Sequence, residues 1–254
     1  MTILHRLFLP LLTGTLLIAA TSAQADDWSY ELKPYLLLSS IDGDASVGRV
    51  TGADVAVDFD TILENLELGG MLHFEALKSD GLIIGLDYGF MDLGADIPGP
   101  LTGFLDASLR QGILEGFLGK RLERGNGTLD YIGGVRWWDF DIDLELNDSV
   151  FPGSPAVNIE EDWIDVYVGA RWISSINQRW SYLLYGDLGG FGLQSDFTGK
   201  IQAGLIYDLN ESFNLNLDYI ALWVDYETGT PSTTSRFAYD TVTHGPVLGF
   251  TWQF

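Results

Sequence analysis

Histidine limits the acid–base chemistry open to this chain, because the sequence contains only three histidines. His73 has an acidic residue, Glu75, two positions further on, so in a strand the two side chains would share a face. A hydrolase of the serine–histidine type also needs a serine hydroxyl within hydrogen-bond reach of the histidine. No motif in the sequence identifies a serine as the partner of His73. We therefore expect His73 and Glu75 to be interior polar residues, and we predict no catalytic residue.

A second group of residues has the chemistry of a cation site. The run DFDIDLE places Asp139, Asp141, Asp143 and Glu145 on one face of a strand, and oxygen-rich clusters are the ligands that Ca²⁺ and Mg²⁺ prefer. No spacing matches an EF-hand loop, so a solvated acidic rim is the alternative. The adjacent Trp137–Trp138 pair interrupts the alternation just before this run and predicts a β-bulge.

The amino-acid composition argues against some classes of partner and excludes some kinds of site. The chain has 36 acidic and 13 basic residues and a formal net charge of −23, which argues against nucleic acid as a partner. It has no cysteine, which excludes disulfides and thiolate metal sites.

The elements that would position these residues are strands. In residues 82–90 every second residue is apolar, which is the period of a strand, and no apolar run of 18 residues follows the N-terminal segment, which argues against transmembrane helices. Short turns (78–81, 123–127, 175–179, 209–212) alternate with longer connections (41–67, 96–102, 147–161, 191–196, 227–239). Unequal turns and charges at alternate strand positions are typical of a membrane barrel and costly inside a sandwich core. We predict an all-β, antiparallel, up-and-down transmembrane β-barrel.

Ten strands are expected, with twelve or eight as the alternatives. Residues 41–67 are ambiguous, because SVGRV and ADVAVDF have the pattern of short strands and TILENL that of a helical turn. We prefer ten strands, with 41–67 as a hairpin or as a segment folded into the mouth of the barrel. The expected strands are 28–40, 68–78, 81–95, 103–122, 127–146, 162–174, 180–190, 197–208, 213–226 and 240–254.

The first 25 residues have the three parts of a secretory signal peptide. A basic Arg6 precedes an apolar run over 7–20, and an A-x-A cleavage site occupies 23–25. A membrane anchor is the alternative, but a span needs about 20 apolar residues. We predict a cleaved signal peptide, residues 1–25, followed by one barrel domain, residues 26–254, that is exported through the inner membrane.

Strand parity assigns a set of charged residues to the barrel lumen. Arg136 and Arg171 recur in the motifs GVRW and GARW, each beside a tryptophan on the opposite face. An ion network that fills the lumen and a selective solute path both explain the set; we favour the network, because small barrels are commonly filled by their own side chains. By the same parity, His244 faces lipid near the outer rim. The predicted lumen residues are Glu31, Lys33, His73, Glu75, Asp87, Glu115, Asp130, Arg136, Asp165, Arg171, Asp187, Lys200 and Asp218, with Arg121 expected to join them.

The C-terminal strand, GPVLGFTWQF, carries Phe250, Trp252 and Phe254 at alternate positions. This ending resembles the assembly signal of bacterial outer-membrane proteins. The wider pattern WSYELKPYL, VDFDTILENLELGGMLHFEA, DYIGGVRWWDFDIDL, GDLGGFG and FAYDTVTHGPVLGFTWQF is similar to a family of proteobacterial outer-membrane barrel proteins, mostly of unassigned function. The resemblance covers nearly all of residues 28–254. It implies the barrel fold, the outer membrane of a Gram-negative bacterium, contact with its lipid and lipopolysaccharide, and recognition by the barrel assembly machinery.

The function that these patterns favour is that of a non-enzymatic integral barrel, either structural or a narrow passive pore for small solutes. A hydrolase that modifies lipid A or phospholipid is the alternative from another class. Omptin proteases, which are also ten-stranded barrels, use an Asp-x-His pair, and none occurs here. A third hypothesis is adhesion or ligand binding by acidic extracellular loops, with divalent cations as candidate partners at the rim. No cofactor is predicted.

Overall fold

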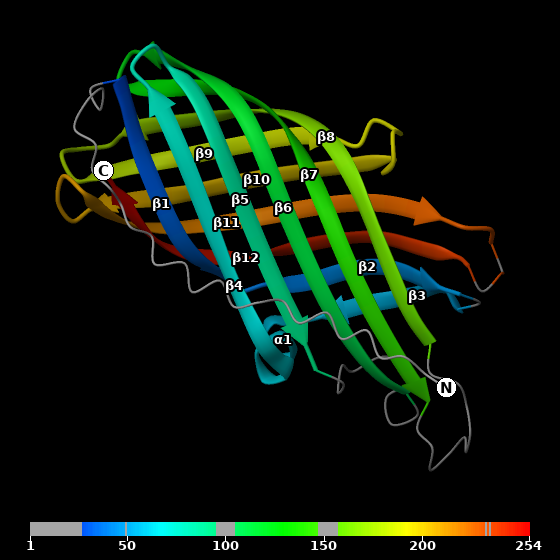
Figure 1. Cartoon of the computed structure of the whole chain (residues 1–254). Coiled ribbons are helices and arrows are strands. Elements are labelled where there is room, and N and C mark those ends of the chain that lie inside the picture. Colours follow the sequence, from blue (N-terminus) through cyan, green and yellow to red (C-terminus); the bar gives the residue numbers. More distant parts are fainter. Residues whose placement is uncertain (1–26, 49, 95–104, 147–156, 232, 234) are drawn as a thin grey trace, which may run out of the picture.

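The computed structural model describes residues 27–48, 50–94, 105–146, 157–231, 233 and 235–254, and these form a closed antiparallel barrel (Figure 1). Ten strands make the wall in the order β1-β4-β5-β6-β7-β8-β9-β10-β11-β12, and β1 pairs with β12 to close it. The prediction of an all-β, ten-stranded antiparallel barrel is thereby confirmed. The predicted signal peptide lies outside the described residues. The wall strands are β1 Trp28–Leu37, β4 Leu66–Lys78, β5 Leu82–Leu93, β6 Leu105–Arg124, β7 Gly127–Leu146, β8 Val157–Ser175, β9 Trp180–Gly189, β10 Phe197–Asp208, β11 Phe213–Thr228 and β12 Phe237–Gln253.

Short turns connect the strands at one end of the barrel, which we name the short-turn end. We name the opposite end the long-loop end. At the short-turn end, the same device recurs: the side-chain Oδ1 of Asp80, Asn177 and Asn210 accepts a hydrogen bond from the backbone N–H two residues on, at 3.0, 3.0 and 2.9 Å. Such self-bonding is the reason that Asp and Asn favour turns. The β6–β7 turn instead uses Gly125, whose φ of 58° is accessible to glycine at little cost.

β2 (Ser40–Val47) and β3 (Val50–Val57) extend the wall at the long-loop end, and the helix that follows them packs Ile62 against Ile41 and Leu93. β12 pairs with β1 as far as Leu37↔Val247 and then, in the same register, with β2 from Ser40↔His244. β3 pairs with β2, and the short helix α1 (Phe59–Asn65) follows. Asp58 begins this helix, because its Oδ1 accepts a hydrogen bond from the Thr61 N–H at 2.9 Å. Residues 41–67 thus contain the predicted hairpin, β2–β3, and in addition a helix whose Ile62 is buried against Ile41 and Leu93.

The predicted β-bulge at Trp137–Trp138 is wrong. β7 pairs with β6 and with β8 through both tryptophans without a change of register. Trp137 is 38% exposed and faces outward, whereas Trp138 is 1% exposed and faces inward. The alternation holds because the inner face itself becomes apolar from Trp138 toward the long-loop end.

The outer face of the wall is apolar, and aromatic side chains gather on it near the short-turn end. Leu118, Val168 and Leu217 are each more than half exposed on this face. Near the short turns, Trp180 packs against Tyr207, and Phe213 stacks on Phe250 at 5.3 Å between ring centroids. An apolar outer band edged by aromatic residues is the pattern of a barrel that faces lipid. Within the described residues, the structure contains no helix of the length and apolarity needed to cross a membrane.

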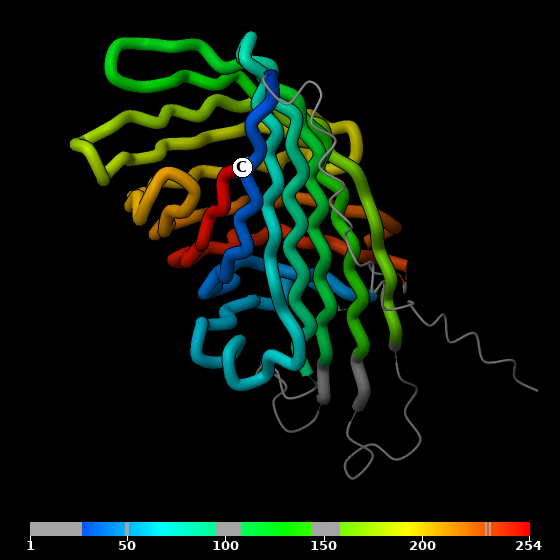
Figure 2. Tube along the Cα trace, turned by 60° about the vertical axis from the view of Figure 1, so that its left-hand side comes forward, coloured from blue at the N-terminus to red at the C-terminus, as the bar shows by residue number. Residues whose placement is uncertain are grey.

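The inner faces of β5–β8 and of β9–β12 approach one another across the lumen. Figures 1 and 2 both show the green strands β6–β8 crossing the yellow-to-red strands β9–β12. The lumen that they enclose has two zones. Charged residues occupy the zone toward the short turns, and aromatic residues occupy the zone toward the long loops.

Candidate functional site: the barrel interior

Four charged residues make an ion network nearest the short-turn end. Arg171 donates to Glu75 at 2.7 Å and to Asp130 at 2.9 Å, and Arg121 donates to the other oxygen of Asp130 at 2.8 Å. Glu75 and Asp130 are buried, at 4% and 0% exposure. β4, β6, β7 and β8 each supply one residue, and strand parity brings all four inward. The arrangement satisfies buried charges, as their burial requires.

A second ion network, centred on Arg136, lies next to the first. The fully buried guanidinium donates to Glu115 at 2.9 Å, to Asp187 at 3.0 Å and to the Thr198 hydroxyl at 2.8 Å. Lys200 also donates to Glu115, at 2.8 Å. Two tyrosines with the parity of the predicted lumen residues lie beside this network: Tyr185 donates to Asp187 at 2.6 Å, and the ring of Tyr167 lies 4.8 Å from the Arg136 guanidinium carbon.

His73 is bound on one side by an acid. Its Nδ1 lies 2.8 Å from Asp87, which also accepts from the Tyr35 hydroxyl at 2.5 Å. Its Nε2 lies 3.8 Å from Glu75 and 4.0 Å from Glu31. None of these neighbours is a hydroxyl or thiol nucleophile, so the contacts of His73 within the described residues fit a polar interior role.

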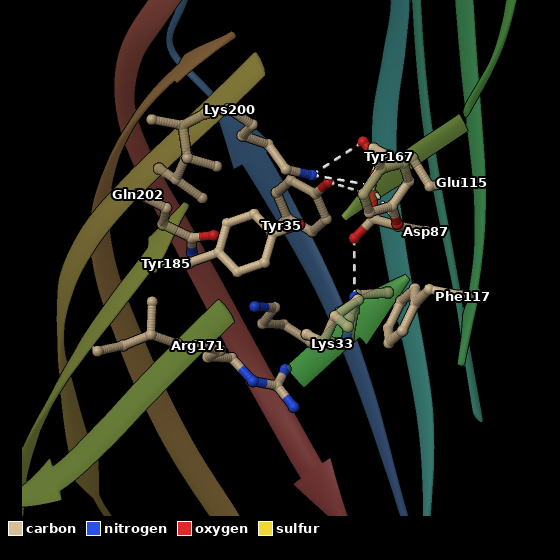
Figure 3. Close-up of a pocket in the computed structure, with 15 residues that line it drawn as sticks. Lys33, Tyr35, Asp87, Glu115, Phe117, Tyr167, Arg171, Tyr185, Lys200 and Gln202 are labelled. Carbon is tan, nitrogen blue, oxygen red and sulfur yellow. Dashed lines mark hydrogen bonds and ion pairs between the residues drawn. The ribbon is translucent and has the colours of Figure 1, made fainter. Parts of the chain in front are cut away.

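Lys33 and Asp218 also face the lumen but do not form an ion pair at 4 Å or less. The Lys33 ammonium lies 5.7 Å from the centroid of the Tyr35 ring and points into a cavity of about 70 Å³ (Figure 3). Asp218 accepts from Gln202 at 2.9 Å. The cavity has room for a few water molecules.

Asp165 lies apart from both ion networks, and its contacts could not be read from parity. This fully buried carboxylate accepts from the indole N–H of Trp138 at 3.0 Å and of Trp163 at 3.2 Å. It also accepts from the backbone N–H of Ser195 at 3.1 Å and from its hydroxyl at 2.7 Å. Ser195 belongs to residues 190–196, which we name the β9–β10 loop. Asp165 thus joins that loop to the aromatic zone.

That zone, which we name the aromatic seal, packs inside the lumen toward the long-loop end, between β7–β8 and β11–β12. Trp163 stacks on Tyr226 at 4.0 Å, on Phe140 at 5.2 Å and on Trp138 at 5.4 Å between ring centroids. Phe140 packs edge-on against Tyr239 at 4.9 Å. The seal consists of Trp138, Phe140, Trp163, Val224, Tyr226, Phe237 and Tyr239, all at most 8% exposed.

The acidic run after Trp138 faces outward, not into the lumen. Asp141 pairs with Arg110 at 2.7 Å, and Asn158 donates to both Asp141 and Asp143 at 2.8 Å. Asp139 lies opposite another acid, Asp162. No group of three or more histidine or acidic residues in the described part of the chain is arranged to hold a metal ion. The side chain of Glu145 and most of the predicted acidic loop 147–161 lie outside the described residues.

His244 lies on the outer face, where parity places it, but its partners come from other strands. Its Nε2 is 2.9 Å from Asp42 on β2, and its Nδ1 is 2.7 Å from the Tyr219 hydroxyl on β11. Sequence reasoning missed this group because Asp42 and His244 are 202 residues apart. Only the β2–β12 register could have indicated it.

No protein-family model and no curated protein matches the chain. Among solved structures, the outer membrane protease OmpT from Escherichia coli superposes with a TM-score of 0.55 at 9% identity, over 91% of this chain and 98% of that one. This is the fold of outer-membrane β-barrels. The attachment invasion locus protein Ail of Yersinia pestis gives a TM-score of 0.41 at 11% identity, over 90% of this chain and 99% of that one. At such identities the likeness shows the fold alone.

Proposed function

We propose that the protein is an integral, non-enzymatic β-barrel of a Gram-negative outer membrane, and that it is structural because its lumen is sealed. The aromatic seal is the observation that carries this proposal. Trp138, Phe140 and Trp163 are at most 1% exposed and stack on one another on the neighbouring strands β7 and β8, and Trp163 stacks across the lumen on Tyr226 of β11. A hydrated ion passing through them would lose its water without gaining polar partners. The proposal takes the structural form of the barrel over the narrow pore.

A membrane location is supported by the outer face. Leu118, Val168 and Leu217 are 60%, 60% and 53% exposed, and soluble monomers rarely expose contiguous apolar surface on this scale. Because outer-membrane barrels have short periplasmic turns and longer extracellular loops, the short-turn end faces the periplasm and the long-loop end faces the cell exterior. Fractionation of cell membranes tests the location: the protein should sediment with the outer membrane and resist carbonate extraction.

Planar-bilayer recording tests the seal. The wild-type protein should give a flat trace, and Arg136→Ala should also be flat because the aromatic seal remains in place. Trp138→Ala/Trp163→Ala removes two stacked rings from the lumen and should introduce conductance. Trp137→Ala is the matched control, since Trp137 is the neighbour of Trp138 and its side chain faces lipid.

Two outcomes would contradict the sealed lumen. One is steady conductance by the wild-type protein that changes in Arg136→Ala. The other is a double variant that folds, as shown by retained heat-modifiable migration in gels, and still gives a flat trace like that of Trp137→Ala.

The non-enzymatic part is supported by the surroundings of His73, whose nearest polar partner is the carboxylate of Asp87. Deletion of the gene should leave the mass spectrum of extracted lipid A and phospholipids unchanged. A new or lost acyl group that His73→Ala reproduces would instead support a lipid hydrolase.

A further inference from the structure

The outer wall carries a polar group directly above the apolar outward residues of β12. Tyr219, His244 and Asp42 lie side by side on β11, β12 and β2 and form the hydrogen-bonded chain described above. The His244 side chain is 31% exposed and that of Asp42 is 55% exposed. Ionisable residues at membrane depth are costly and commonly mark functional sites.

The height of this group on the wall corresponds to the headgroup level of the outer leaflet. Below His244, the outward residues of β12 are Pro246, Leu248, Phe250 and Trp252. From Trp252 to His244 the strand rises roughly 20 Å, at about 3.4 Å per residue and a tilt of about 40°. The apolar band of such barrels is about 25 Å tall. His244 therefore lies near its upper edge.

The hydrogen-bond chain leaves only acceptors free. A carboxylate accepts and cannot donate, so His244 Nε2–H donates to Asp42; in the neutral imidazole, His244 Nδ1 then accepts the Tyr219 O–H. The remaining capacity is the second oxygen of Asp42 and the lone pairs of the Tyr219 oxygen. An ammonium group offers three N–H donors and no acceptor, and it complements this arrangement. A phosphate, which offers only acceptors, does not.

Charge on the same face favours the same ligand. Asp225, Asp240, Asp44 and Asp54 lie directly opposite one another on β11, β12, β2 and β3, a few residues above His244. Like charges in such positions destabilise a sheet. No described lysine or arginine forms an ion pair with any of the four; Arg236, just before β12, pairs with Glu227 at 2.7 Å. A cation bound at this face would relieve the repulsion.

We propose that Tyr219, His244 and Asp42 form a binding site for a membrane lipid whose headgroup carries a primary ammonium. The ammonium donates to Asp42 and Tyr219, the acidic row above stabilises its charge, and the acyl chains lie along the apolar wall at Pro246, Leu248 and Leu217. His244 is a positioning residue, because it orients both acceptors. This site rests on the membrane location in the proposed function and is independent of whether the lumen is sealed.

Native mass spectrometry of the full mature protein tests the site. The protein is reconstituted with equal amounts of ethanolamine, choline and glycerol phospholipids that have identical acyl chains. The wild type should retain the ethanolamine lipid several-fold over the glycerol lipid, which lacks the cation, and over the choline lipid, which has the charge but no N–H donor. Asp42→Asn and Tyr219→Phe should each reduce this preference. Asp139→Asn is the matched control, an outward acid on β7 that lies opposite Asp162.

Three outcomes would overturn the site. The wild type could retain the three lipids in equal amounts. The preference could persist unchanged in Asp42→Asn. Millimolar Mg²⁺ could raise retention of the glycerol lipid to that of the ethanolamine lipid, which would show that the acidic row binds divalent cations instead. Conductance by the wild type would contradict only the sealed lumen and would leave this test unaffected.

Discussion

Replacement of Arg136 by alanine removes the centre of the second ion network. The fully buried guanidinium contacts Glu115, Asp187 and Thr198 at 2.8–3.0 Å. After the substitution, Glu115 keeps Lys200 as a partner, and Asp187 keeps the hydroxyl of Tyr185. Both carboxylates stay buried with less positive charge near them.

The magnitude follows from burial. Breaking a buried ion pair by removing one partner costs about 3–5 kcal/mol, because a buried charge loses its compensation. The surviving donors place Arg136→Ala at the lower end of that range, about 3 kcal/mol. An exposed pair is worth about 0–1 kcal/mol. Arg110, 51% exposed at its side chain and paired with Asp141 at 2.7 Å, therefore provides the matched control.

Reversible urea unfolding from liposomes, followed by tryptophan fluorescence, measures both variants. The expected result is a free energy of unfolding lowered by about 3 kcal/mol in Arg136→Ala and by less than about 1 kcal/mol in Arg110→Ala. Arg136→Met should recover part of the loss by filling the volume. If Arg136→Ala and Arg110→Ala were equally stable, the reasoning from buried charge would be refuted.

Three further predictions concern single contacts. Asp165→Asn replaces one acceptor oxygen by a donor that faces indole and hydroxyl donors, so it should lower the free energy of unfolding by about 1–3 kcal/mol. It should also increase chymotrypsin cleavage within the β9–β10 loop. Unchanged cleavage would argue that Asp165 does not anchor this loop. Gly204→Ala should destabilise the barrel, because the new methyl group would overlap the Asp218 carboxylate, whereas Gly133→Ala meets no heavy atom nearer than 3.8 Å and should be tolerated; equal unfolding midpoints would contradict this. The backbone N–H of Leu82 donates to Asp80 in its turn and lowers the pKa of this carboxyl group. The stability that the carboxylate contributes is therefore complete above the ordinary carboxyl pKa and is lost as the pH falls through the lowered pKa of the folded protein. Asp80→Asn should remove this acid dependence, which a comparison of unfolding at neutral and acidic pH would detect.

Alternation along single strands was enough to predict which residues face the lumen. The period of two fixes the face of every residue once a strand is recognised, and so Arg136 and Arg171 could be placed inward from GVRW and GARW. The same rule failed to interpret Trp137 and Trp138, because both faces of β7 are apolar there. Periodicity cannot distinguish an apolar inner face from a bulge, and for that reason the aromatic seal was not predicted.

Contacts between strands could not be predicted from the sequence, because they depend on the register of strands that are distant in the chain. Arg171 meets Glu75 across 96 positions, and His244 meets Asp42 across 202. Each contact requires the alignment of strands that are distant in the chain. Parity could say that His244 faces outward, but not that Tyr219 and Asp42 lie within hydrogen-bond distance on either side.

The ion networks contribute more to the choice of register than to stability. A well-paired buried ion is often no more stabilising than an apolar side chain of similar volume. A slip of one residue, however, would move every inward side chain of a strand to the outer face. For β7 it would place Arg136 against lipid, at a cost of about 2–4 kcal/mol near the midplane. The apolar residues of the seal impose no such penalty, because Trp138 and Trp137 could exchange faces. The charged zone therefore fixes the register, and the aromatic zone packs in the register that the charged zone sets.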